Sequence, residues 1–147
     1  MESSNEYDTT ATVKIDDKIT EAFYQQYNGN LNWWNPTPLL QDLEMNTVSN
    51  GKHQLSLEFK ENPSRCKPLA VRALADDSEW DTTYNYVDFI TDFQFQGNKM
   101  QGAFEVPEGL GKKYTKLVFE MEVFWHRHKK DVCYFASGLY YFGVELV

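Results

Sequence analysis

The chain has 147 residues, of which 41% are hydrophobic and 16% aromatic, and its formal net charge is −8. This length suits one folded domain, and the hydrophobic content argues against wholesale disorder. An acidic surface repels phosphate backbones and anionic lipid headgroups, so neither nucleic acid nor a membrane is expected as a partner. No apolar run is long enough to span a bilayer and the N-terminus lacks a signal-peptide core, which predicts a cytoplasmic or nuclear protein.

The N-terminal segment divides into a polar part and a possible helix. Residues 1–17 are polar and acidic, and we expect a flexible tail with at most a weak edge strand over Thr12–Ile15. Ile19–Tyr27 carries apolar residues at helical spacing, which predicts a short helix capped by Asp16 or Asp17. We therefore expect a single folded domain over residues 18–147.

From His53 onward, apolar residues recur at every second position, which predicts strands. The predicted strands are His53–Phe59, Leu69–Leu74, Asp88–Gln96, Met100–Val106, Lys116–Trp125, Val132–Phe135 and Leu139–Val147. Turn residues separate them, as in Gln96–Lys99, whereas His126–Asp131 reads as a polar turn and Ser137-Gly138 as a bend. The pattern predicts an all-β fold, an antiparallel immunoglobulin-like β-sandwich of about seven to eight strands.

Lys116–Trp125 shows the clearest alternation. Its apolar residues fall on one face and its two carboxylates on the other; the apolar set is Leu117, Phe119, Met121 and Val123, and the acidic set is Glu120 and Glu122. An antiparallel strand with one buried and one solvated face has this pattern.

The residues that carry catalysis or bind metals are sparse. His126 and His128 would share one face of an extended segment, but zinc needs three or four ligands, so a solvated hairpin tip is expected. Residues 76–81 concentrate four carboxylates without the pattern of a calcium loop. Asp76, Asp77 or Glu79 could serve a glycoside hydrolase, although a solvated acidic loop is the commoner interpretation. His53 has no nucleophile beside it in sequence, and we expect no enzyme, no metal and no cofactor.

Two further residue types bear on structure and binding. Cys66 and Cys133 are expected to be free thiols, because the chain lacks a leader. Among the rings, Trp33 and Trp34 are the best exposed candidates, since adjacent residues of an extended segment cannot face the same core and the prolines at 36 and 38 fix the loop. Trp80, Tyr140 and Tyr141 complete the predicted ligand- or partner-binding set.

From Gly51 to Val147 the layout resembles carbohydrate-binding module family 21, the glycogen- and starch-binding β-sandwich of protein phosphatase 1 glycogen-targeting subunits. The matching positions are Lys67, Leu69, Val71, Arg72, Asp76 and Trp80, followed by Phe104-Glu105-Val106-Pro107. In the terminal sugar-binding motif Gly138 and Tyr141 match, whereas the amide positions hold Phe135, Ala136 and Tyr140. Lys116–Phe119 comes near the phosphatase-docking consensus but has Leu117 at its key position, and we interpret it as core.

Three functions follow as expectations. The leading one is a non-catalytic binding module that contacts another protein, as an adaptor or as a regulatory or targeting domain. The second, implied by the resemblance, is a glucan-binding module in which Trp33, Trp34, Trp80 and Tyr141 stack on sugars. The third is a β-barrel carrier of a small apolar ligand.

Overall fold

The computed structural model describes residues 7–26, 43–75, 79–84, 89–129 and 131–147, and for residues 26, 79–84, 127–129 and 132–135 it describes the backbone alone. These ranges contain eleven strands and the short helix α3 (Leu110–Lys113). The strands are β1 (Ala11–Ile15), β2 (Lys18–Glu21), β3 (Phe23–Gln26), β4 (Met45–Val48), β5 (Gly51–Phe59), β6 (Arg65–Ala75), β7 (Glu79–Tyr84), β8 (Ile90–Gln96), β9 (Lys99–Val106), β10 (Lys116–Lys129) and β11 (Val132–Leu146). The all-β prediction is confirmed, with more strands than expected.

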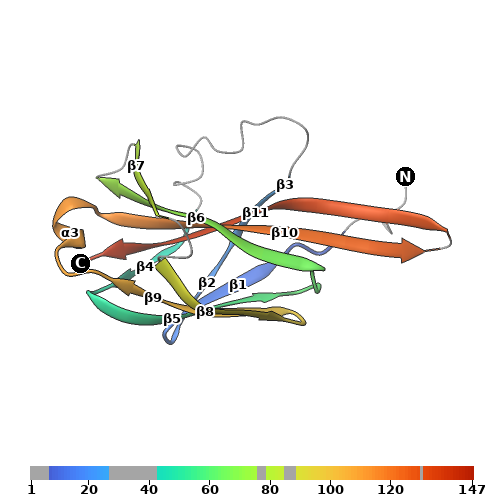
Figure 1. The fold of residues 1–147 in the computed structure, drawn as a ribbon, viewed down its shortest axis with the longest axis horizontal. Helices are drawn as coiled ribbons and strands as arrows, with labels where there is room; N and C mark the ends of the chain where they lie inside the picture. Colours follow the sequence, from blue (N-terminus) through green and yellow to red (C-terminus); the bar gives the residue numbers. More distant parts are fainter. Residues whose placement is uncertain (1–6, 27–42, 76–78, 85–88, 130) are drawn as a thin grey trace.

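The strands form two sheets that lie face to face (Figure 1). The five-stranded sheet has the order β2-β1-β5-β9-β8, and the six-stranded sheet has the order β3-β11-β10-β6-β7, with β4 also paired to β11. All described pairings are antiparallel except that of β4 with β11. The molecule is therefore the predicted β-sandwich.

Two-residue periodicity builds the five-stranded sheet. In β5, His53, Leu55, Leu57 and Phe59 are buried while the residues between them are more exposed, and β1 alternates in the same way. Gln96 pairs with Lys99 around Gly97, whose φ of 65° glycine adopts without steric cost, so the predicted hairpin turn is confirmed.

Aromatic rings fill the space between the sheets. Phe119 of β10 stacks on Phe142 of β11 at 5.1 Å between ring centroids and packs against Phe104 of β9 at the same distance. Trp125 is buried and donates its indole N–H to the carbonyl oxygen of Glu61 at 3.0 Å. Each fully buried ring of this size contributes about 2 kcal/mol or more of hydrophobic stabilisation.

The N-terminal predictions need correction. Ala11, Val13 and Ile15 are buried, and β1 lies between β2 and β5, so the folded part includes residues that we expected in a flexible tail. The helix predicted over Ile19–Tyr27 is wrong, because β2 and β3 occupy the described part of this segment, which ends at Gln26. β2 pairs with β1 and β3 pairs with β11, so the backbone hydrogen bonds of both segments go to neighbouring strands.

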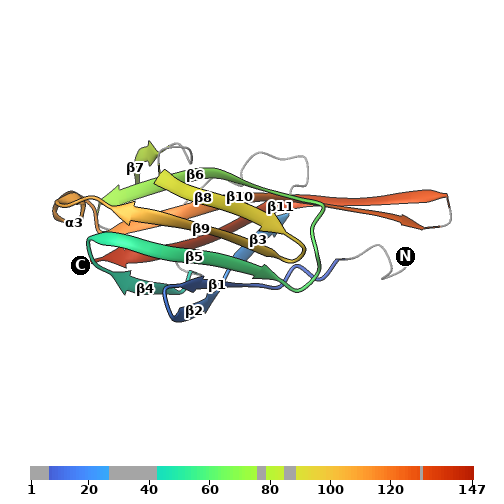
Figure 2. The ribbon, with the colours of Figure 1, turned by 60° about the horizontal axis from the view of Figure 1, so that its bottom comes forward.

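The C-terminal hairpin is longer than predicted. β10 and β11 pair without interruption from Lys116 and Glu145 to Lys129 and Val132, so Ser137-Gly138 is no bend and most of His126–Asp131 is strand. Among the described residues, the last partners of the hairpin are Arg65 of β6, opposite Phe124, and Gln26 of β3, opposite Gly138. Beyond them the hairpin extends past the other strands of its sheet (Figures 1 and 2).

The strand register also shows that the two cysteines lie too far apart to form a disulfide. Cys66 lies opposite Val123 of β10, whereas Cys133 lies opposite His128, five residues further along the same strand. That offset is about 17 Å along the strand, and a disulfide requires Cα atoms within about 7 Å. The two thiols cannot pair in this fold, and Cys66 is a free, buried cysteine.

Gly138 offers a test of the β3–β11 contact. A Cβ atom at this position would lie 2.6 Å from both the carbonyl oxygen of Gln25 and the Tyr24 hydroxyl. We predict that Gly138→Ala lowers the free energy of unfolding by about 2 kcal/mol or more, because backbone must move to admit the methyl group. Urea denaturation measures it. The neighbouring Ser137→Ala is the control and should change stability by less than about 0.5 kcal/mol; equal effects of the two variants would contradict the predicted contact.

Candidate functional site

The outer face of the six-stranded sheet is the unusual surface of this molecule. Leu74, Val118, Leu139 and Tyr141 form an apolar cluster there, and all four are completely buried. Partly buried residues pack against this cluster, namely Phe23, Leu43, Met45 and Leu69. The outer face of an antiparallel sandwich sheet is ordinarily polar and solvated, so this sheet is packed on both sides.

A buried ion pair lies within this face. Arg72 of β6 donates from Nε to Oε2 of Glu120 on β10 at 2.6 Å, and Glu120 is only 2% exposed. The other carboxylate oxygen, Oε1, is also buried and has no hydrogen-bond partner among the described atoms. Glu120 does lie on the face predicted from the sequence, but it is buried rather than solvated. An acid in this position is costly to bury, and its cation must stay to compensate it.

A hollow of about 340 Å³ opens on the same outer face, at the base of the projecting hairpin. It is lined by Arg65, Lys67, Glu122, Val123, Phe124 and Ser137. The strand register explains this grouping, because Phe124 pairs with Arg65 on one side and Ser137 on the other, while Glu122 pairs with Lys67. Three adjacent strands therefore hold these side chains on a rigid backbone.

The hollow combines an aromatic ring with an excess of cations. The guanidinium of Arg65 lies 5.0 Å from the centroid of the Phe124 ring, a cation–π geometry. Arg65 and Lys67 outnumber the single carboxylate of Glu122, although the chain as a whole has a net charge of −8. The local charge is thus opposite in sign to that of the whole protein.

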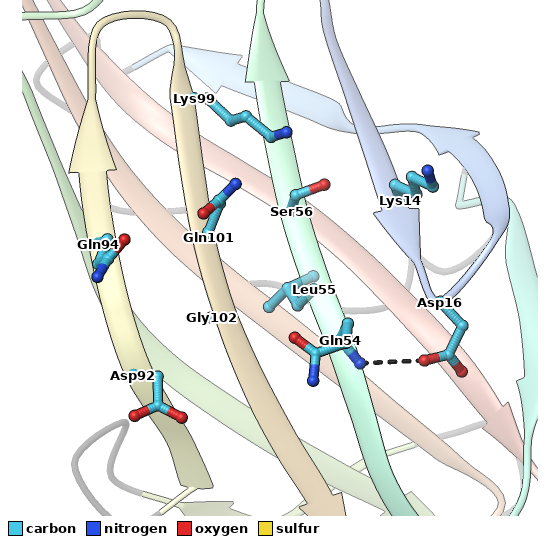
Figure 3. Close-up of a pocket in the computed structure, with 10 residues that line it drawn as sticks. All are labelled: Lys14, Asp16, Gln54, Leu55, Ser56, Asp92, Gln94, Lys99, Gln101 and Gly102. Carbon is cyan, nitrogen blue, oxygen red and sulfur yellow. Dashed lines mark hydrogen bonds between the residues drawn. The ribbon is translucent and has the colours of Figure 1, made fainter.

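A second hollow, of about 370 Å³, lies on the outer face of the five-stranded sheet and is polar (Figure 3). Its lining comes from β1, β5, β8, β9 and the turn after β1: Lys14, Asp16, Gln54, Leu55, Ser56, Asp92, Gln94, Lys99, Gln101 and Gly102. Asp16 accepts a hydrogen bond from the backbone N–H of Gln54 at 3.0 Å. In Figure 3 amides, ammonium groups and carboxylates stand over adjacent strands, so this surface can exchange many hydrogen bonds with a polar ligand.

The tryptophans of the predicted site fall largely outside what the structure shows. Trp33 and Trp34 lie outside the described residues; the described chain stops at Gln26 of β3 and resumes at Leu43, just before β4. β3 and β4 both pair with β11. The backbone of Trp80 in β7 lies opposite Leu74, but its side chain is not described.

Tyr140 and Tyr141 are both described, and neither is exposed. Tyr140 points into the core between the sheets and donates its hydroxyl to the carbonyl oxygen of Thr9 at 2.6 Å. Tyr141 points the other way, into the outer apolar cluster. Both side chains are 0% exposed, so in this structure they pack the fold and offer no ring face to a sugar or a protein.

Where the structure describes them, the candidate catalytic and metal-binding side chains do not come together in one site. Asp76 and Asp77 lie outside the described residues, and the side chains of Glu79 and His128 are not described. Within the described part of the chain, no three His, Cys, Asp or Glu side chains gather into a possible metal site. Burial raises the pKa of the Cys66 thiol and of the Tyr24 hydroxyl to about 12, so both stay protonated at neutral pH.

Sequence reasoning missed the residues that line both hollows. Phe124 had a usable signal, because the alternation of β10 places it on the face of Glu120 and Glu122, where an aromatic residue is out of pattern. The cross-strand position of Arg65 depends on the β6–β10 register, which no local pattern reveals.

No protein-family model matches this chain, and no curated protein or solved structure matches it. Among the described residues, no helix has the length and apolar character needed to cross a membrane.

The buried ion pair generates a stability prediction. Arg72→Met leaves the Glu120 carboxylate buried without its cation, and we expect it to lower the free energy of unfolding by about 3 kcal/mol or more. The double variant Arg72→Met/Glu120→Leu removes both charges and should be more stable than the single variant. Urea denaturation of the set tests this, and a single variant that is as stable as the double variant would contradict the description of Glu120 as a compensated buried charge.

Proposed function

We propose that this protein is a non-catalytic binding module that contacts another protein through the outer face of its six-stranded sheet, as an adaptor or regulatory domain. The observation that carries the proposal is the hollow at the base of the β10–β11 hairpin, where Arg65 lies over the ring of Phe124.

The composition of this hollow supports a protein partner. Arginine and aromatic residues dominate the energetic centres of protein interfaces. Phe124 is half-buried, so part of its ring already rests against the protein and loses little freedom when a partner covers the rest. The surrounding strand backbone is fixed on both sides by β6 and β11, which reduces the entropy lost on binding.

The charges of the hollow favour an acidic partner. Two cations and one carboxylate leave a positive excess beside an aromatic ring. The complementary surface is a protein segment that presents a carboxylate next to an apolar side chain. Because Arg65 and Lys67 are exposed, their contribution acts mainly on the rate and salt dependence of association.

Charge reversal tests this proposal. The wild type should capture partner proteins from a native extract. The Arg65→Glu/Lys67→Glu variant should capture these proteins in amounts about tenfold lower, or lower still, because it repels an acidic partner. The amounts are measured by quantitative mass spectrometry of the captured material. Binding should also weaken as salt is raised, since exposed charges are screened.

The matched control is Lys14→Glu/Lys99→Glu, which makes the same change of charge on the opposite outer face of the sandwich. It should retain the captured proteins. Equal loss in both double variants would show a response to net charge alone, and the proposal would then fail.

The polar hollow of the five-stranded sheet favours a second candidate, a glucan-binding module. Three glutamine amides, a serine hydroxyl and two lysines face solvent from a shared sheet surface, and such groups hydrogen-bond sugar hydroxyls.

The barrel on which the carrier hypothesis depended is not formed, because no described strand of one sheet pairs with a strand of the other.

Affinity electrophoresis in glycogen or amylose gels tests the glucan candidate. If the polar hollow binds glucan, the wild type is retarded and Gln54→Ala/Gln101→Ala migrates faster through the same gel. Migration of the wild type that is unaffected by either polysaccharide removes this candidate, and it leaves the protein-binding proposal intact.

A further inference from the structure

His53 is held in an unusual way. Its ring is almost fully buried, Nδ1 lies 2.7 Å from Oδ2 of Asp16, and Nε2 lies 2.8 Å from the carbonyl oxygen of Ser49. Both distances are those of good hydrogen bonds. Both ring nitrogens of this single side chain are therefore engaged.

The chemistry of the two partners fixes the protons on the ring. An ionised carboxylate and a backbone carbonyl can only accept hydrogen bonds. A neutral imidazole has one N–H, so it would direct a lone pair at one of the two oxygens. Only the doubly protonated, positively charged ring donates to both, and the negative charge of Asp16 compensates it.

Asp16 keeps its charge across the range in which histidines titrate. Partial burial opposes ionisation, but the hydrogen bonds from His53 and from the backbone N–H of Gln54 outweigh it and hold the pKa of Asp16 below 3.8. Histidine is the side chain that normally changes charge between about pH 5 and 8. The Asp16 carboxylate therefore stays ionised throughout that range.

The hydrogen bonds among Asp16, His53 and Ser49 connect two turns and both sheets. Asp16 lies in the turn between β1 and β2, with a φ of 57°, and Ser49 lies in the connection from β4 to β5. β4 belongs to the six-stranded sheet and β5 to the five-stranded sheet, so this connection carries the chain from one layer to the other. Nearby, the backbone N–H of Glu21 at the end of β2 donates to the Glu44 carboxylate ahead of β4 at 3.1 Å.

The groups around the imidazole come from three sides. The β1–β2 turn supplies the Asp16 carboxylate, which is also influenced by the ammonium group of Lys18. The β4–β5 connection supplies the Ser49 carbonyl, and β9 supplies the ring of Phe104, whose centroid lies 5.3 Å from that of His53. Asp16 is the one carboxylate that the described structure places against His53.

We propose that His53 is a pH-sensitive latch: doubly protonated, it holds the β1–β2 turn against the connection between the two sheets, and loss of one ring proton releases that turn. The sign follows from the geometry. The latch is closed while both ring nitrogens carry a proton and opens when rising pH removes one of them, because one of the two hydrogen bonds is then lost. Opening loosens the β2 edge of the sandwich, close to β4.

The wild-type protein itself provides the test, by NMR between pH 5.5 and 8.5. Long-range ¹H–¹⁵N spectra should show both nitrogens of His53 protonated at the acidic end. Over the titration, the exchange protection of the Asp16 and Gln54 amides, corrected for intrinsic exchange, should fall by about tenfold, the value expected for the loss of one charge-assisted hydrogen bond. The amide of Phe119 in the core of β10 is the internal control and should not respond.

Asp16→Asn is the decisive variant. Asparagine tolerates a positive φ, and its NH₂ group can donate to an unprotonated ring nitrogen but opposes the N–H of a doubly protonated ring. The turn should therefore stay closed at high pH, and the fall in protection with rising pH should be abolished or reversed. A singly protonated His53 ring at pH 5.5, or Asp16 and Gln54 protection that follows the Phe119 control through the titration, would overturn the proposal. Neither of these two observations requires a variant to fold.

Discussion

The structure depends on β10 being buried on both of its faces. Its inward residues, from Leu117 to Trp125, pack into the core between the sheets, and its outward Val118 and Glu120 are buried as well. β6 and β11 flank it along most of its length, so it is the central strand of its sheet. Because Val118 and Glu120 are buried on the outward face of β10, the six-stranded sheet carries packed side chains on this part of its outer surface.

This constraint gives the two outer surfaces different characters. The five-stranded sheet follows the ordinary pattern, with a polar outer face of lysine, glutamine and aspartate side chains. The six-stranded sheet has an apolar outer cluster, a buried Arg72–Glu120 pair and, next to them, a hollow that exposes cations beside an aromatic ring. The second surface has the composition of a protein interface, which is why the proposed contact is placed there.

The sequence predicted the parts of the fold that local alternation controls. The runs at His53–Phe59 and Lys116–Trp125 became β5 and β10 with the expected residues inward, and the turn around Gly97 formed. The helix expected over Ile19–Tyr27 failed because β2 and β3 pair with β1 and β11, and the pairing of β3 with β11 joins segments that are far apart in sequence. Strand pairing of this kind overrides a short helical spacing.

The predicted binding residues show the same limit. Both Tyr140 and Tyr141 were predicted as binding residues, although neighbouring residues of a strand point to opposite sides. The unbroken apolar run from Leu139 to Phe142 is instead the pattern of a strand that is buried on both faces. Arg65 and Glu120 acquire their roles only through the β6–β10 register, which a single sequence does not encode locally. Trp33 and Trp34 remain predictions, because they lie outside the described residues.

The central claim is that the outer face of the six-stranded sheet binds the partner protein. Site-specific photo-crosslinking tests it most directly. A photoreactive benzoyl-phenylalanine is placed at Phe124 in one protein and at Gln101, on the opposite outer face, in another. After irradiation in a native extract, we predict a discrete covalent adduct with a second protein from position 124 and none from position 101. Adducts from position 101 alone, or the same adducts from both positions, would contradict the account.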